Sequence, residues 1–146
     1  MEFTLKPVGV VRSPYKNFSQ APYQGRFSDA VSEIEVFEQF SPALKDLETC
    51  THLIVLYWLD RARRDVMVTR TPYGEEERGV FATRSPHRPN PIGFCVVELL
   101  EVRGNVLRVR WLDALDGSPV VDIKPYSSDI DSVENAVIGW FREVSK

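Results

Sequence analysis

The sequence predicts an all-β fold, a barrel or a sandwich with small helical insertions. Six or seven short apolar segments recur at fairly regular spacing along the 146 residues. Some of them alternate apolar and polar residues, as half-buried strands do. No internal repeat and no low-complexity tract interrupts this pattern. The length fits one domain, so we expect a single domain over residues 1–146.

In the first third of the chain, two strands flank a long loop. Residues 3–13 read as a strand, and residues 14–30 form a loop rich in Pro, Gly, Gln, Asn and Ser. Residues 32–40 then alternate apolar and acidic side chains. A short helix is expected over 41–48, because Ser41 is a good N-cap and the proline after it suits the first helical position.

The middle of the chain holds the strongest strand signal. Residues 51–59, THLIVLYWL, are almost all apolar, which predicts a central strand covered on both faces. A polar, charged connection follows, with a possible short strand at 66–69. GVFAT, residues 79–83, is expected to begin a further strand.

The last third predicts a hairpin, another strand and an ambiguous tail. Residues 94–102 and 106–112 read as two strands joined by a three-residue turn, Arg103-Gly104-Asn105. A turn at Asp116-Gly117 leads into the next strand. The tail from residue 128 fits either a helix or an extended segment.

Composition and charge exclude several classes of protein. With 43% hydrophobic residues the chain can form a real core. No apolar run has the length of a signal peptide or of a membrane span of roughly 18 residues, so a cytoplasmic protein without a membrane partner is expected. The net charge of −3 argues against a general nucleic-acid binder, so any RNA contact needs a local patch. The two cysteines and two histidines have no metal-ligand spacing, so no metal is expected, and Cys95 reads as a buried thiol.

A stiff cationic segment, GVFATRSPHRPNPIGF, runs from residue 79 to residue 94. Its three prolines restrict the backbone, so the loop loses little entropy when it meets a ligand. Arg84 and Arg88 are therefore candidates to bind a carboxylate or a phosphate. The alternative is a rigid connection whose arginines are only solvated.

Acidic residues form a second candidate cluster in LDALDGSPVVDIKPY, residues 112–126. Asp116 is assigned to the turn. Asp113 and Asp122 are expected at strand ends, where a carboxylate can bind a ribose hydroxyl, a cation or an amine, or can pair with a structural arginine. The common dinucleotide, phosphate-loop and hydrolase motifs are absent from the sequence.

The same segments resemble a known family. GVFATRSPHRPNPIG, VGVVRSPYK near the start and LDALDGSPVVDIKPY are similar, in order and spacing, to the TsaA-like (TrmO) family of S-adenosylmethionine-dependent tRNA (adenine-N6)-methyltransferases. The resemblance implies a small closed or partly open β-barrel, a homodimer, S-adenosylmethionine as cofactor and the tRNA anticodon loop as partner. The implied acceptor is N6 of the threonylcarbamoyladenosine beside the anticodon.

The resemblance also implies the site residues. Cofactor contacts would fall on Gln24, Gly25, Asp60, Arg61, Arg84, Phe94, Arg110, Trp111, Leu112 and Asp113. Arg84 suits the carboxylate of the cofactor, Asp113 a hydroxyl or ammonium group, and Phe94 an adenine or thioether face. Asp122 is the candidate to take the released proton. Substrate contacts would be Arg88, His87, Lys124 and Tyr126.

Two other functions stay open at this point. The cofactor could serve methylation of a small metabolite or a protein instead of tRNA. The chain could also be a non-catalytic module whose rigid loop binds an anion or RNA.

Overall fold

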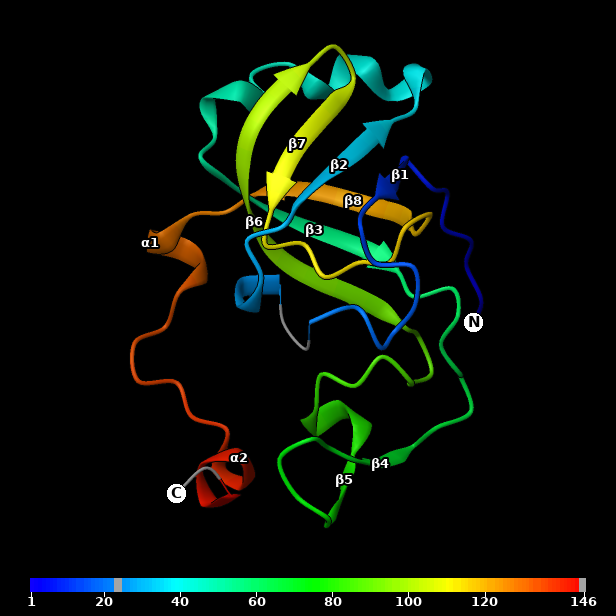
Figure 1. Cartoon of the computed structure of the whole chain (residues 1–146), viewed down its shortest axis with the longest axis vertical. Coiled ribbons are helices and arrows are strands. Elements are labelled where there is room, and N and C mark those ends of the chain that lie inside the picture. Colours follow the sequence, from blue (N-terminus) through cyan, green and yellow to red (C-terminus); the bar gives the residue numbers. More distant parts are fainter. Residues whose placement is uncertain (23–24, 145–146) are drawn as a thin grey trace. The chain divides into compact units, whose positions relative to one another are not determined.

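Six strands close into an antiparallel barrel in the computed structural model, which describes residues 1–22 and 25–144. Their order around the barrel is β1-β2-β7-β6-β3-β8 (Figure 1). The strands are β1 (Gly9–Arg12), β2 (Val31–Val36), β3 (His52–Trp58), β6 (Ile92–Arg103), β7 (Val106–Arg110) and β8 (Pro119–Pro125). The all-β prediction is confirmed, and the barrel, not the sandwich, is the form that it takes.

The core fills the interior of this barrel. Successive side chains of a strand point to opposite faces, so every second residue faces inward. The fully buried side chains include Val11, Ile34, Leu53, Val97 and Leu107, which come from five different strands. The predicted central strand at 51–59 is β3, whose inward residues are buried and whose outward residues are partly covered.

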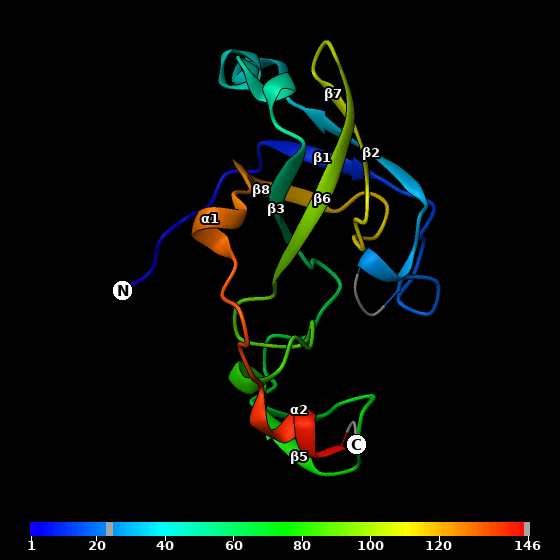
Figure 2. The same cartoon turned by 90° about the vertical axis from the view of Figure 1, so that its left-hand side faces the viewer.

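One end of the barrel is covered by 3-10 helices. Between β2 and β3 the chain forms η2 (Glu38–Leu44) and η3 (Leu47–Thr49), next to the turn of the β6–β7 hairpin (Figure 2). The expectation that Ser41 caps a helix is wrong, because η2 begins at Glu38 and includes Pro42. Phe40 and Leu44 pack against the core, and this packing draws the residues before the proline into the helical turn.

The two predicted turns are present, one with a different length. β6 and β7 are joined by Gly104 and Asn105 alone, so the loop has two residues where three were expected. Gly104 has φ of 60°, a conformation that glycine adopts without a Cβ penalty. Asp116-Gly117 precedes β8 as expected, with φ of 85° at Gly117.

Residues 61–91 and 127–144 belong to a second compact unit, separate from the barrel unit of residues 1–60 and 92–126. It contains a two-stranded sheet of β4 (Val68–Arg70) and β5 (Glu77–Gly79), followed by η4 (Val80–Ala82). The prediction of a strand over 79–83 is wrong. Val80 is buried, and its carbonyl accepts hydrogen bonds from the amide and the hydroxyl of Thr83 at 3.1 Å each, so the chain turns there.

The tail is partly helical, and no strand forms in its described residues. It forms the short helices α1 (Ser128–Asp131) and α2 (Gly139–Val144), with an irregular segment between them. Within the second unit, Trp140 Nε1 donates to the carbonyl of Ala82 at 2.8 Å. No helix in the described part of the chain is long and apolar enough to cross a bilayer.

Candidate functional site

Asp113 lies in a segment that leaves β7 and packs onto the barrel core. β7 ends at Arg110, and Trp111 has φ of 75°, which is unusual for a bulky residue and breaks the strand. Leu112 and Ala114, on either side of Asp113, are 1% and 0% exposed and belong to the core. The backbone around Asp113 is therefore fixed, while the residue as a whole stays half-exposed.

Two buried side chains hold the Asp113 carboxylate. The hydroxyl of Tyr57, on β3, donates a hydrogen bond to Oδ1. The thiol of Cys95, on β6, donates to the same oxygen at 2.9 Å. Cys95 is 4% exposed, which confirms the predicted buried thiol.

Gly93 explains how the Tyr57 ring reaches this position. Tyr57 and Gly93 are paired across β3 and β6. A Cβ at residue 93 would lie 2.2 Å from Cζ of the ring. Only glycine lets the ring lie over the neighbouring strand without a clash.

Trp111 and Gly25 are in direct contact. A Cβ at Gly25 would lie 1.6 Å from the carbonyl oxygen of Trp111, so the loop approaches the backbone after β7 at a distance that excludes any side chain. Arg26 places its guanidinium 4.3 Å from the Trp111 ring centroid, and His52 stacks with that ring at 5.7 Å. Gly25 and Trp111, two predicted cofactor positions, are therefore neighbours through their backbones. The indole ring of Trp111 packs against Arg26 and His52.

Arg110 faces the outer wall of the barrel. Its guanidinium donates two hydrogen bonds to Glu98 Oε2, at 2.7 and 2.9 Å. Cross-strand pairing brings Arg110 opposite Glu98, and Glu98 opposite His52. The side chain of Arg110 therefore lies on the outer wall in an ion pair, next to the Trp111 ring.

Asp122 does not lie at a strand end, and that expectation is wrong. It is the fourth residue of the seven-residue strand β8, on the outer wall. Its carboxylate forms an ion pair with Lys124 at 3.0 Å and accepts a hydrogen bond from the amide of Ile123 at 2.9 Å. Leu56 is paired both with Asp122 and with Phe94, so the three residues form one row on this wall. Phe94 is 42% exposed there.

Hydrogen bonds of the Arg88 and His87 side chains hold the proline-rich loop of the second unit. Arg88 donates to the carbonyls of Thr83 and Ser85 at 3.0 and 3.1 Å. The ring Nδ1 of His87 accepts a hydrogen bond from the amide of Arg63 at 2.9 Å. Stiffness thus comes from side chain–backbone bonds as well as from the prolines.

Arg64 ties the second half of that loop. Its guanidinium donates to the carbonyl of Pro89 at 2.8 Å and to Asn90 Oδ1 at 3.1 Å. Arg84, the candidate for a carboxylate, is exposed.

The remaining predicted site residues lie mostly at the surface. Asp60 and Arg61 are exposed, Lys124 is exposed and Tyr126 is half-buried. Gln24 lies outside the described residues. Within residues 1–22 and 25–144, no group of three or more His, Cys, Asp or Glu side chains could hold a metal ion.

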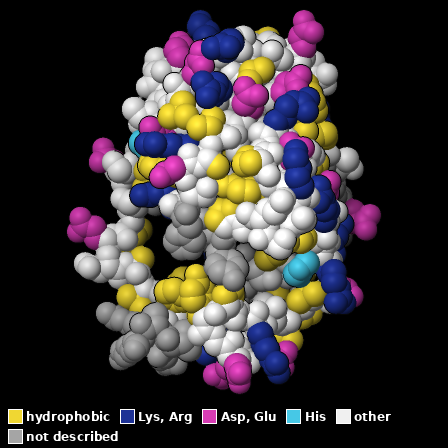
Figure 3. All heavy atoms as spheres, viewed as in Figure 1, with side chains coloured by type: hydrophobic (Ala, Val, Ile, Leu, Met, Phe, Trp, Pro, Cys, Tyr) yellow, Lys and Arg dark blue, Asp and Glu magenta, His cyan; other side chains and the backbone are white. Residues whose placement is uncertain are grey.

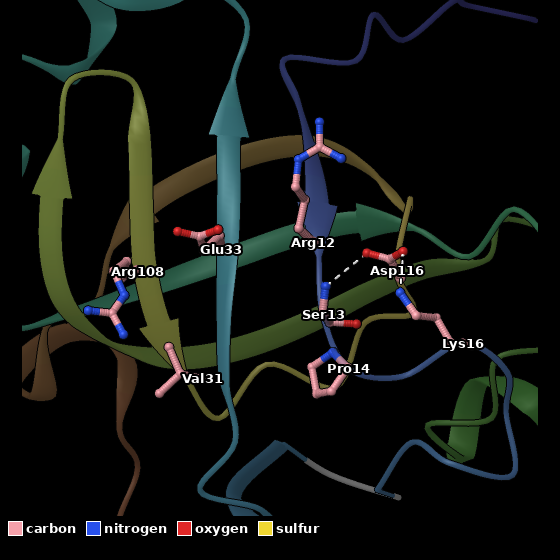
Figure 4. Close-up of a pocket in the computed structure, with 8 residues that line it drawn as sticks. All are labelled: Arg12, Ser13, Pro14, Lys16, Val31, Glu33, Arg108 and Asp116. Atoms are coloured by element: carbon pink, nitrogen blue, oxygen red, sulfur yellow. Dashed lines mark hydrogen bonds and ion pairs between the residues drawn. The ribbon is translucent and has the colours of Figure 1, made fainter.

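A shallow depression on the outer wall of the barrel contains none of these residues (Figure 4). Its cations are neutralised: Arg12 pairs with Glu35, Lys16 with Asp116 and Arg108 with Glu101. On the face seen in Figure 3, basic and acidic side chains are likewise mixed and form no field of one sign. The depression is lined by Arg12, Ser13, Pro14, Lys16, Val31, Glu33, Arg108 and Asp116.

Sequence reasoning missed the residues that support Asp113 and Trp111. Tyr57 and Cys95 read as core residues, and they are 56 and 18 residues away from Asp113 along the chain. Arg26 and His52 gave no signal either. The glycine at 93, inside an otherwise apolar strand, was the one available sign of a close approach.

Comparison with known proteins gives a consistent result. The model of the family described as tRNA-methyltransferase O N-terminal domain matches residues 10–132. A probable S-adenosyl-L-methionine-binding protein of Archaeoglobus fulgidus is 70% identical over 97% of this chain, which covers 38% of that protein. The tRNA (adenine(37)-N6)-methyltransferase of Escherichia coli is 38% identical over 92% of the chain, which covers 62% of that enzyme.

A solved structure shows the same fold. The crystal structure of TrmO from Pseudomonas aeruginosa aligns with a TM-score of 0.81 at 33% identity, over 96% of this chain and 63% of that one. The chain therefore spans less than two thirds of each of these relatives.

Proposed function

The chain belongs to the tRNA-methyltransferase O N-terminal domain family, and from this premise we propose that it is an S-adenosylmethionine-dependent methyltransferase of tRNA. The acceptor is N6 of adenosine 37, the position named for the E. coli relative, in the nucleoside that already carries a threonylcarbamoyl group. Binding of S-adenosylmethionine is supported by the name of the A. fulgidus relative. Within this chain, the observation that carries the proposal is the Asp113 carboxylate, fixed by two buried donors beside the Gly25–Trp111 contact.

The chemistry of the candidate residues fits the cofactor. S-adenosylmethionine carries a carboxylate, an ammonium, a sulfonium, two ribose hydroxyls and an adenine. Asp113 accepts hydrogen bonds from the hydroxyls or the ammonium, and Arg84 suits the carboxylate. Phe94, with 42% of its surface exposed, offers an aromatic face to the adenine or the thioether. Close backbone approach is possible at Gly25.

The residues act mainly by positioning. When bound, the cofactor would supply an activated methyl group for transfer to N6. The Asp113 carboxylate, held by two hydrogen bonds, would orient the cofactor, and such positioning can supply much of the acceleration. The proton leaves N6 for a carboxylate, and we assign this role to Asp122. Its carboxylate forms an ion pair with Lys124 at 3.0 Å on the outer wall of the barrel.

The RNA contacts are assigned to Arg88, His87, Lys124 and Tyr126. The guanidinium of Arg88 donates to neutral carbonyls, which hold it in place without cancelling its charge, so it can still attract a phosphate. Tyr126 and His87 offer rings for stacking against a base.

We also propose that the chain acts as one functional domain and as a homodimer. The family match at residues 10–132 runs through both compact units, which supports a single evolutionary and functional domain. Sedimentation of the purified protein tests the dimer. Cytoplasmic location stays a prediction.

Transfer of a labelled methyl group tests the proposed function. The protein is incubated with methyl-labelled S-adenosylmethionine and with tRNA that either carries or lacks the threonylcarbamoyl group, and the nucleosides are analysed by mass spectrometry. We expect one added methyl on N6 of the modified adenosine and none in the unmodified tRNA. Label in unmodified tRNA alone contradicts the proposed acceptor.

The same experiment separates the alternatives. The tRNA acceptor is named for the E. coli relative, and another acceptor is the second candidate for this chain. Label in small molecules or protein, and none in RNA, supports that candidate. RNA binding that does not depend on the cofactor, without any transfer, supports a non-catalytic module.

A further inference from the structure

Asp113 receives two hydrogen bonds from the inside of the barrel, from residues that no motif connects to it. Tyr57 and Cys95 both donate to Oδ1. They are 3% and 4% exposed, and they come from the adjacent strands β3 and β6. Neither side chain can reach solvent to exchange this bond for one with water.

The shared acceptor orients the carboxylate. A carboxylate oxygen has about two lone pairs, and Tyr57 and Cys95 use those of Oδ1. Two bonds on one oxygen restrict the rotation of the carboxylate plane.

The backbone of Asp113 is fixed independently of its side chain. Leu112 and Ala114 are buried in the core on either side. Gly93 sets the position of the Tyr57 ring, since no side chain fits between the ring and β6. The carboxylate is thus held both by its backbone and by the two hydrogen bonds to Oδ1.

We propose that Tyr57 and Cys95 are positioning residues, which hold the Asp113 carboxylate in the orientation in which it contacts S-adenosylmethionine. This inference rests on the proposed function, because it requires Asp113 to contact the cofactor. It assigns a cofactor-linked role to two residues that the barrel otherwise uses as core.

Calorimetric titration with S-adenosylmethionine tests this role in four variants. Tyr57→Phe removes the hydroxyl and keeps the ring, and we expect about tenfold weaker binding, as for the loss of a bond to a charged group. Cys95→Ala is expected to weaken binding about threefold, because a thiol is a weaker donor. Cys95→Ser keeps a donor and restores near wild-type affinity. In tRNA methylation, Tyr57→Phe raises the KM for the cofactor and leaves the KM for tRNA unchanged.

Tyr15→Phe is the matched control. Tyr15 is 8% exposed and donates to Ser28 Oγ at 2.8 Å, so it loses a comparable bond in the same unit without touching Asp113. Its affinity for the cofactor should equal that of the wild type.

The outcomes separate the two levels of the proposal. Equal affinity changes in Tyr57→Phe and Tyr15→Phe, or wild-type affinity in Tyr57→Phe, overturn the positioning role and leave the proposed function standing. Should Tyr57→Phe fail to fold, the comparison of Cys95→Ala with Cys95→Ser decides: equal affinities overturn the role. A wild-type protein that binds no S-adenosylmethionine overturns the proposed function itself.

Discussion

Gly93 lies beneath the ring of Tyr57, and a Cβ at residue 93 would stand 2.2 Å from the ring carbon Cζ. This one absent side chain lets an aromatic residue of β3 extend over β6 toward Asp113. The strand pairing of the barrel and the candidate cofactor site therefore depend on the same glycine.

Replacing this glycine gives the first prediction. In Gly93→Ala the new methyl group meets a rigid ring, so the ring or the strand must move. We expect the free energy of unfolding to fall by about 2 kcal/mol, as in overpacked cores, measured by urea denaturation.

Gly79→Ala is the control for that prediction. No atom lies within 4 Å of a Cβ at residue 79, and its φ is −60°. Its stability should change by less than about 0.5 kcal/mol. Equal losses in the two variants would show that steric contact with Tyr57 is not the cause.

The second prediction concerns the dependence of stability on pH. Lys16, by hydrogen bond, and then the amide of Ser13 lower the pKa of Asp116. A lowered carboxyl pKa contributes stability above the ordinary Asp value near 3.8, and this contribution is lost as pH falls through the folded-state value. We expect the stability difference between wild type and Asp116→Asn to be full at pH 7 and to shrink below about pH 4, measured by urea denaturation at a series of pH values.

Asparagine is the right replacement there because it keeps the turn that precedes β8. Asp29→Asn is the control variant for this pH series. Asp29 is exposed and makes no hydrogen bond or ion pair with the residues that the structure describes. A difference for Asp116→Asn that stays constant down to pH 3 would contradict the assigned cause.

The third prediction concerns the stiffness of the proline-rich loop. Arg88→Gln removes the two bonds to the carbonyls of Thr83 and Ser85. We expect the amides of residues 83–88 to exchange with solvent about tenfold faster, in line with the loss of about 1.4 kcal/mol of local stability. Hydrogen exchange followed by mass spectrometry measures this.

Arg70→Gln is the control for the loop. Arg70 is an exposed residue of β4, and its replacement should leave the exchange of residues 83–88 unchanged. If Arg88→Gln also leaves this exchange unchanged, the bonds of Arg88 do not contribute to the rigidity of the loop.

Sequence patterns predicted those elements whose signal is local. Alternation identified β2, and the continuous apolar run of residues 51–59 identified β3. The Asp116-Gly117 turn followed from turn chemistry. The Asp116 carboxylate, however, accepts the amide of Ser13, which is 103 residues away along the chain, and this contact could not be predicted.

Elements set by tertiary contacts were not predicted. GVFAT has good strand formers, but burial of Val80 and the bonds of Thr83 to its carbonyl turn the chain there. Asp122 was placed at a strand end, but β8 continues to Pro125 because Ile123, Lys124 and Pro125 pair with β3, and this pairing has no local signal in the sequence.

Only part of the candidate site could be predicted from the sequence, because the rest depends on tertiary contacts. Asp113 and Gly25 were found through resemblance, whereas the donors that hold Asp113 come from strands distant in sequence and have the composition of core residues. A hydrogen bond between a buried tyrosine and a distant carboxylate can be recognised only once the strand pairing is known.

Titration of the purified protein with S-adenosylmethionine tests the central claim most directly, when wild type is compared with Arg84→Ala, Asp113→Ala and the control Arg70→Ala. The account predicts a wild-type dissociation constant on the order of micromolar, at least about tenfold weaker binding in Arg84→Ala and Asp113→Ala, and no change in Arg70→Ala, with all four proteins folded. No heat of binding with the wild type, or equal affinity in all four proteins, would contradict it.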